Sequence, residues 1–236
     1  PLSIGEVLRD ARLGDLRTLF EGREEYDFFG LTRRLFDLLD ERRVDCVLVG
    51  GMAMLQYVDG RNADLDVLAR QLGLPPAEID ADLHELARQR HVVLDPEGQI
   101  VMAHPFAAIP LGFAVMGAQT LWWGGCAWDS FALPHLLPTN DPVLVATRCP
   151  ACSQPLAWNV GTDAPPPGPE VAHFLVPAAH IWDDVVHTCS HQRLFCSTTC
   201  VDAWLTATGN QRGYVMDLAT LWRLAQGWYA GRLDSG

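Results

Sequence analysis

The sequence predicts an α+β protein, and three observations lead to that class. Short apolar runs typical of strands are mixed with helical patterns, without the regular strand–helix alternation of a parallel α/β fold. Hydrophobic residues make up 49% of the 236 residues and charged residues 19%, which is typical of a globular chain. The chain contains no internal repeat. We therefore expect a helical extension with one strand (1–60), a winged-helix-like domain (61–104) and a mixed α/β core (105–236).

The extension begins with a helical pattern. Leucines recur at helical spacing within residues 6–43, for example at Leu31, Leu35 and Leu38, so two helices are expected there. The following run, "DCVLVGG", is β-branched and ends in two glycines. It predicts a buried strand followed by a tight turn.

The second region carries the winged-helix pattern of two helices followed by a hairpin. "DLDVLARQLGL" predicts a short amphipathic helix, and "PPAEIDADLHELARQR" a second helix with prolines at its start. "HVVLDPEGQIVMA" predicts two strands around an Asp-Pro-Glu-Gly turn. The commonest role of this pattern is DNA binding. Here the second helix is acidic and would repel phosphate, so a structural or substrate-covering role is favoured.

The core is expected to mix short strands with helices. The strand-like runs lie at 111–123, 142–147, 155–160 and 171–176. The helical stretches lie at 127–137, 198–207 and 217–230. A proline-rich loop, "TDAPPPGPE", separates the last two strands.

Charge and composition restrict the partners. The formal net charge is −12, and an acidic chain does not favour nucleic acid or an anionic membrane, because phosphate binding needs a basic patch. No apolar run reaches the length that spans a bilayer, and the start of the sequence lacks a signal-peptide pattern. Seven cysteines at uneven spacing indicate chemistry or metal binding rather than a secreted disulfide framework. We expect a cytoplasmic protein.

The stretch "GGCAWDSF" places a thiol and a carboxylate three residues apart. If a helix begins near Cys126, then Cys126 and Asp129 share one face of its first turn. A helix N-terminus stabilises anions, so it is expected to lower the pKa of Cys126 and favour the thiolate. A carboxyl group beside a thiolate can hold a proton. The alternative is a buried thiol next to a helix-capping aspartate.

Four further cysteines have the spacing of a metal site. Cys149 and Cys152 form a Cys-x2-Cys pair, and Cys196 and Cys200 form a second pair that enters a predicted helix. Four thiolates suit a tetrahedral structural zinc ion, and "FCSTTCVDAW" resembles the second half of a treble-clef zinc knuckle. The alternative is a set of independent buried thiols in a reducing compartment.

Two segments together resemble the organomercurial (alkylmercury) lyase family: "WWGGCAWDSFALPHLL" and "HTCSHQRLFCS". The resemblance covers residues from about 60 to 236. It implies that Cys126 and Cys189 bind the mercury of a small organometallic substrate, that Asp129 protonates the leaving carbon, and that low-molecular-weight thiols remove the mercury. Soft metal ions prefer thiolate ligands, which agrees with these residue types. No organic cofactor is expected.

Two departures from that family leave other functions open. The chain has four additional cysteines and about fifty additional residues at its front. A lyase-like scaffold used for other chemistry in a biosynthetic pathway, acting on another soft hydrophobic substrate, is one alternative. A zinc- or soft-metal-binding protein without turnover is another.

A third alternative comes from residues 44–68, which resemble a nucleotidyltransferase signature. Gly50 and Gly51 stand where that family's backbone approaches the triphosphate, and Asp64 and Asp66 where its carboxylates hold Mg²⁺. A third carboxylate on a downstream strand has no convincing counterpart here. The segment after Asp66 also fits the first winged-helix helix, with Asp64 as its cap.

Overall fold

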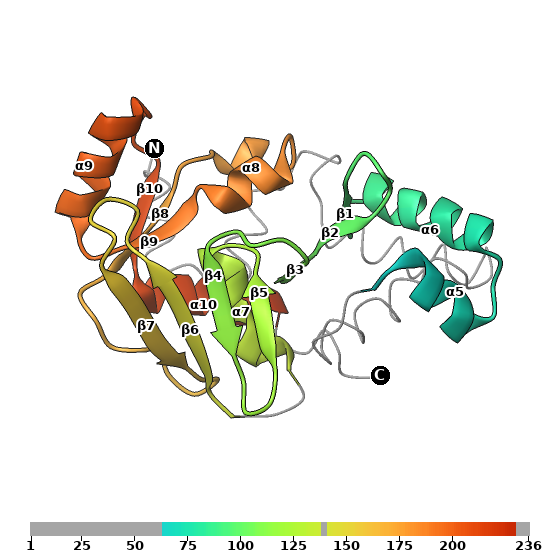
Figure 1. The fold of residues 1–236 in the computed structure, drawn as a ribbon. Coiled ribbons are helices and arrows are strands. Elements are labelled where there is room, and N and C mark those ends of the chain that lie inside the picture. Colours follow the sequence, from blue (N-terminus) through green and yellow to red (C-terminus); the bar gives the residue numbers. More distant parts are fainter. Residues whose placement is uncertain (1–62, 138–140, 230–236) are drawn as a thin grey trace. The chain divides into compact units, whose positions relative to one another are not determined.

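The computed structural model of the chain describes residues 63–137 and 141–229, which divide after residue 104 into two units (Figure 1). The expected N-terminal helices and strand lie outside the described residues, as do Gly50 and Gly51.

The smaller unit contains helix α5 (Leu65–Leu72), helix α6 (Pro76–Arg88) and an antiparallel hairpin of strands β1 (Val93–Leu94) and β2 (Ile100–Ala103). Helix α5 ends at Gly73, which has a positive φ of 68° and so uses the conformational freedom of glycine. The elements follow the expected order, and their assignment as a winged helix stays a prediction.

Helix α6 begins with a proline and buries one apolar stripe. Pro76 occupies the first helical position, where its missing N–H has no intrahelical partner to lose. The stripe consists of Ile79, Leu83 and Leu86, at the spacing expected from the sequence. The Asp95 side chain accepts hydrogen bonds from the backbone N–H groups of Glu97 and Gln99, which orders the hairpin turn.

The nucleotidyltransferase alternative does not fit the local structure. Asp64 is the N-cap residue of α5, and Asp66 lies within the first turn of that helix. The signature requires both carboxylates on a strand that follows the glycine turn. The two carboxylates therefore lie at a helix start, as the competing interpretation predicted.

The larger unit is built on an antiparallel sheet. Its strands are β3 (Phe106–Ala107), β4 (Phe113–Met116), β5 (Leu121–Gly124), β6 (Val143–Arg148) and β7 (Pro155–Val160). They lie in the order β3-β5-β4-β6-β7, with Phe113 paired with Gly124 and Val145 with Trp158. The run at 111–123, expected as one strand, forms most of the β4–β5 hairpin.

A second antiparallel sheet has the order β10-β8-β9. Its strands are β8 (Val171–Phe174), β9 (Gln192–Phe195) and β10 (Tyr214–Asp217). The connections carry a short 3₁₀ helix η2 (Ala178–His180), helix α8 (Val185–Ser190) and helix α9 (Thr198–Thr208). The sequence did not predict α8, β9 or β10, because each is short and lies next to polar residues.

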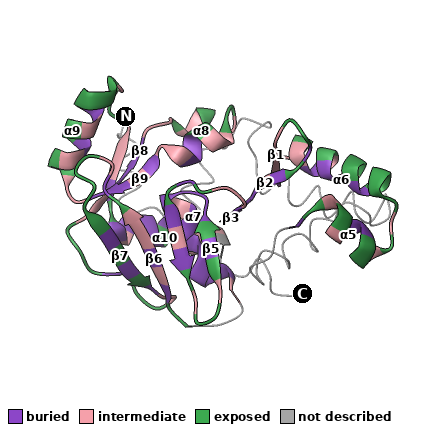
Figure 2. Cartoon of the chain, viewed as in Figure 1, coloured by how far each residue is buried: buried purple, intermediate pink, exposed green. Residues whose placement is uncertain are grey.

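Helix α7 (Ala127–Leu136) forms the centre of the larger unit, and helix α10 (Leu218–Tyr229) packs against it. Nearly every residue of α7 is buried, and the helix also contacts β4, β5 and β6 (Figure 2). A helix that is apolar all round is expected to be buried on all sides. Residues placed on α7 are therefore held by a helix that is packed on nearly every side.

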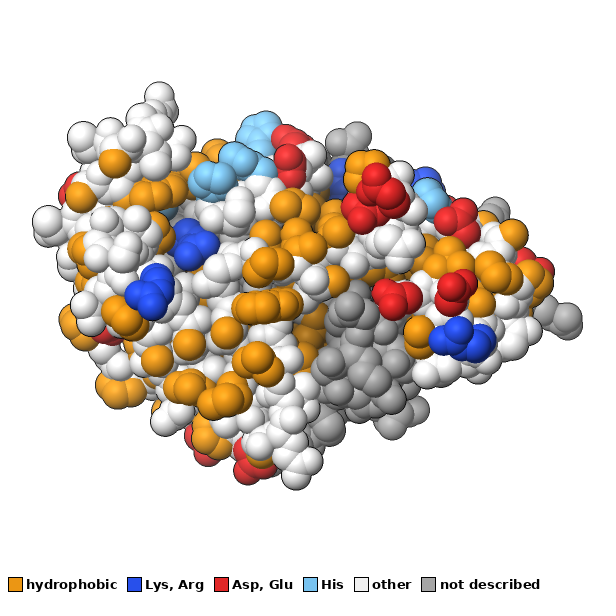
Figure 3. Space-filling view, in the orientation of Figure 1, with side chains coloured by type: hydrophobic (Ala, Val, Ile, Leu, Met, Phe, Trp, Pro, Cys, Tyr) orange, Lys and Arg blue, Asp and Glu red, His pale blue; other side chains and the backbone are white. Residues whose placement is uncertain are grey.

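One face of the larger sheet is apolar and exposed. Met116, Leu121 and Trp123 are 49%, 59% and 43% exposed, and hydrophobic side chains gather over this face in Figure 3. Met116 pairs with Leu121 across the β4–β5 hairpin, so these side chains adjoin on one side of the sheet. The neighbouring pair, Val115 and Trp122, points to the opposite side of the sheet and is buried. Within the described part of the chain, no helix has the length and apolar character of a membrane span.

Candidate functional site

Cys126 stands between strand β5 and helix α7. Its backbone is extended (φ −147°, ψ −171°), and its Sγ accepts a hydrogen bond from the Asp129 backbone N–H at 3.4 Å. Cys126 is thus the N-cap of α7, a position that Ser, Thr, Asp or Asn usually fills. Just before it, a Cβ at Gly124 would collide with the Ser130 side chain, so only glycine lets β5 approach the helix this closely.

Asp129 lies between two thiols. Its Oδ2 is 3.2 Å from the Sγ of Cys126 and 3.7 Å from the Sγ of Cys189. All three residues are at most 5% exposed. The i, i+3 spacing placed Cys126 and Asp129 together as predicted, and the fold brings Cys189 to the same carboxylate oxygen from sixty residues away.

Cys189 is held by a short, well-capped helix. It lies on α8, whose N-cap Asp184 accepts a hydrogen bond from the His187 backbone N–H at 2.8 Å. The neighbouring Thr188 hydroxyl donates to the Ile181 carbonyl at 3.0 Å. These two bonds tie the part of α8 that precedes the thiol to residues 181 and 184.

Gln192 is a member of the site that the sequence analysis missed. It is the first residue of β9, is 3% exposed, and places Oε1 3.0 Å from the Sγ of Cys126. A polar residue at an inward position of a strand is a recognisable signal, but the strand itself was not predicted. The amide, the carboxylate and the two thiols form one buried polar group.

Burial controls the charge of both thiols. Desolvation raises the pKa of Cys126 well above its usual range, and the neighbouring thiol and carboxylate add to this effect. A hydrogen bond with Cys126 lowers the pKa of Cys189, but burial and Asp129 outweigh it, so that pKa is also raised. The expectation that the helix N-terminus makes Cys126 a thiolate is therefore wrong for the free protein. The helix N-terminus is present, but the loss of water around the sulfur has the larger effect.

This arrangement suits a reaction in which protons leave sulfur as a soft metal arrives. Both thiols hold their protons in the free protein, and one carboxylate oxygen lies within reach of both. Metal binding to a thiol requires the proton to leave. Asp129 is placed to accept such a proton and to pass it to a third atom bound between the sulfurs.

The four other predicted cysteines form a separate cluster. The Sγ atoms of Cys149, Cys152, Cys196 and Cys200 all lie within 4.8 Å of one another, and those of Cys152 and Cys196 are 3.6 Å apart. A tetrahedral zinc ion with Zn–S bonds of about 2.3 Å needs sulfurs about 3.8 Å apart. The four sulfurs therefore fit a zinc ion without rearrangement of the backbone.

Backbone amides stabilise charge at one of these sulfurs. Burial acts to raise the pKa of Cys149, but N–H groups of Cys196, Cys152 and Ala151 lower it to about 7. Burial and the neighbouring thiols raise the pKa of Cys196 to about 12.

A comparison with protein-family models finds a match that lies within the larger unit. A family model described as alkylmercury lyase matches residues 106–230, which is more than half of the chain. A crystal structure of the mercury-bound form of MerB2 is similar in fold, with a TM-score of 0.61 and 18% sequence identity. The match covers 84% of this chain and 96% of that one. No protein among the curated sequences matches.

Proposed function

The chain belongs to the alkylmercury lyase family, and from that membership we propose that it cleaves a carbon–mercury bond by protonolysis, with Cys126, Cys189 and Asp129 as the reacting groups. One observation carries the proposal: a single carboxylate oxygen lies within 3.7 Å of both buried thiols. The substrate class is a small organomercurial, R–Hg⁺, delivered as its complex with a low-molecular-weight thiol.

The first step exchanges ligands on mercury. One thiol of the pair bonds to mercury and its proton leaves with the small thiol that carried the substrate. The second thiol then bonds to mercury and gives its proton to Asp129. Two thiolates place more electron density on the mercury-bound carbon than one thiolate does, because soft anions donate strongly to a soft metal.

The second step moves the proton from Asp129 to carbon. The carbon–mercury bond breaks, its electron pair forms the new carbon–hydrogen bond, and the hydrocarbon leaves. Hg²⁺ stays on two thiolates, and Asp129 returns to the carboxylate. Two outside thiols then take the mercury and return their protons to Cys126 and Cys189, so atoms and charges balance over the cycle.

Gln192 supports the Cys126 sulfur through its amide. In the free protein Oε1 faces the protonated sulfur, and rotation of the amide turns Nε2–H towards it once the sulfur is a thiolate. We expect Gln192→Leu to lower kcat/KM by about 10- to 100-fold, since a hydrogen bond to a charged group contributes about 1.5–3 kcal/mol. Steady-state kinetics measure this, with Gln99→Leu, an exposed glutamine of the smaller unit, as the control. Equal kcat/KM for Gln192→Leu and the control would remove Gln192 from the mechanism.

The function itself is tested by hydrocarbon release. Purified protein incubated with phenylmercury and excess dithiothreitol should release benzene catalytically, and in D₂O each benzene should carry one deuterium. Gas chromatography with mass detection measures both. Release no faster than in thiol buffer alone would reject the lyase proposal. Tight mercury binding without hydrocarbon release would then favour the non-catalytic metal-binding alternative. A protein that neither releases hydrocarbon nor binds mercury tightly would favour the lyase-like scaffold used for other chemistry.

A further inference from the structure

We propose that Cys149, Cys152, Cys196 and Cys200 hold one resident zinc ion, which fastens the end of strand β9 to the β6–β7 turn. The metal site itself does not depend on mercury chemistry. Its consequence for positioning Cys189 and Gln192 rests on the function proposed above. Metal content therefore tests the zinc site, and hydrocarbon release tests the proposed function separately.

The four sulfurs come from two separated parts of the chain. Cys149 and Cys152 lie in the turn between β6 and β7, and Cys196 and Cys200 lie where β9 passes into α9 (Figure 1). All four sulfurs lie within 4.8 Å of one another. Chance packing rarely gathers four thiols from two distant segments, whereas a tetrahedral cation requires this arrangement.

The first pair sits in a turn shaped around its sulfurs. The Cys149 backbone N–H donates to the Gln154 carbonyl at 3.0 Å, and the Ser153 N–H donates to the Cys149 carbonyl at 2.9 Å. Ser153 has a positive φ of 61°. This conformation is unfavourable for any residue other than glycine. The turn is therefore held in a strained conformation that keeps Cys149 and Cys152 together.

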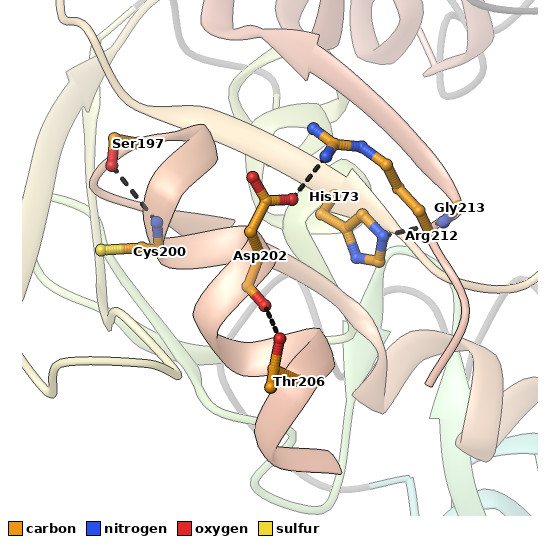
Figure 4. Close-up of polar contacts among 7 residues, drawn as sticks. All are labelled: His173, Ser197, Cys200, Asp202, Thr206, Arg212 and Gly213. Carbon is orange, nitrogen blue, oxygen red and sulfur yellow. Dashed lines mark hydrogen bonds and ion pairs between the residues drawn. The ribbon is translucent and has the colours of Figure 1, made fainter. Parts of the chain in front are cut away.

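The second pair is fixed by the start of helix α9. The Ser197 hydroxyl caps the helix by accepting from the Cys200 backbone N–H at 3.3 Å, and Figure 4 shows the Cys200 sulfur directed away from the helix. An ion pair between Asp202 and Arg212 joins α9 to the segment that follows it. The Gly213 N–H of that segment donates a hydrogen bond to His173 on β8 at 3.0 Å.

The donor set selects the metal and its role. Four thiolates exclude Mg²⁺ and Ca²⁺, which take oxygen ligands, and are typical of tetrahedral Zn²⁺. Four protein ligands leave no open position for substrate, so the ion has a structural role. A disulfide does not describe the cluster, because the Cys152 and Cys196 sulfurs are 3.6 Å apart while a disulfide bond measures about 2.05 Å.

The cluster lies next to the segment that carries Cys189 and Gln192, so a bound zinc ion would help to position these two residues. Strand β9 begins at Gln192 and is followed at once by Cys196, while Cys189 precedes Gln192 by three residues. A clamp on Cys196 and Cys200 therefore limits movement of the segment that carries two members of the reacting site. This effect is one of positioning, since no cluster residue contacts Cys126 or Asp129 among the described hydrogen bonds.

The test is the metal content of the full-length protein. Elemental analysis should find one zinc per chain in the wild type and in Cys126→Ser, and less than a tenth of that in Cys152→Ser and Cys200→Ser. Cobalt exchanged into the wild type should give the thiolate-to-cobalt absorption of a tetrahedral site. Cys126→Ser is the matched control, because it removes one described cysteine outside the cluster.

Three results would overturn the proposal. They are wild-type protein without metal after growth and purification with added zinc, iron in place of zinc, or four cluster thiols that become reactive only after reduction. A loss of metal in the cluster variants should also lower Tm by roughly 10 °C or more, because metal-binding free energy is folding free energy. Failure of the benzene assay with one zinc still bound would reject the lyase proposal and leave the zinc site standing.

Discussion

Replacing Cys189 with serine should lower the rate of carbon–mercury cleavage by at least about a thousandfold, equivalent to about 4 kcal/mol of transition-state free energy. A hydroxyl group is a hard, weak ligand for mercury, so the variant holds the substrate on the Cys126 sulfur alone. The serine side chain remains small and polar beside Asp129, whose Oδ2 lies 3.7 Å from the Cys189 sulfur in the wild type. The change therefore removes the second thiolate while the fold around α8 is kept.

Single-turnover release of benzene from phenylmercury measures this effect. Ser190→Ala, one residue further along α8, is the control for disturbance of the helix. The Cys189→Ser protein should still take up phenylmercury at Cys126, because that thiol is unchanged. A Cys189→Ser protein that keeps more than a third of the wild-type rate would show that one thiolate suffices.

Asp129→Asn should separate binding from cleavage. The amide has nearly the same shape as the carboxylate but cannot receive a proton from sulfur and pass it to carbon. General acid catalysis contributes about 10²–10⁴-fold, and we expect a loss within that range. The first ligand exchange needs no proton transfer to residue 129, so one sulfur should still bind the organomercurial and the protein–substrate complex should accumulate intact.

Mass spectrometry of the protein under native conditions distinguishes the stalled complex from the mercury product by the mass of the retained organic group. Asp184→Asn is the matched control, since Asp184 is an exposed carboxylate that caps α8 and lies close to Cys189 in sequence. Normal turnover by Asp129→Asn would mean that another group, or water, supplies the proton.

Sequence spacing predicted the parts of the site that are local. Cys126 and Asp129 meet because residues three apart share a face at the start of a helix, and each cysteine pair of the cluster is close along the chain. The predicted ranges of α6, α7 and α10 were also close, because their apolar periodicity or proline start is strong. The resemblance to the family, rather than spacing, joined Cys189 to Cys126.

The parts that sequence reasoning missed depend on tertiary contacts. Gln192 enters the site only because β9 pairs with β8 and directs its side chain inward, and four residues give too little pattern to identify that strand. The charge state of Cys126 was also mispredicted. A helix N-terminus can be identified from sequence, but the extent of burial around the sulfur, 2% exposure here, cannot.

The capping role of Cys126 has a consequence for how this position can change. The sulfur that is proposed to bind mercury also satisfies the first turn of α7, so it contributes to architecture even when no substrate is present. Loss of mercury chemistry would not free this position to drift. Serine, threonine, asparagine or aspartate could replace the cap, whereas alanine or leucine would lose about 1 kcal/mol at the start of a helix whose residues are nearly all buried. A related protein that no longer carries out the reaction would thus be recognised by Ser, Thr, Asn or Asp at position 126, followed by an unchanged helix α7.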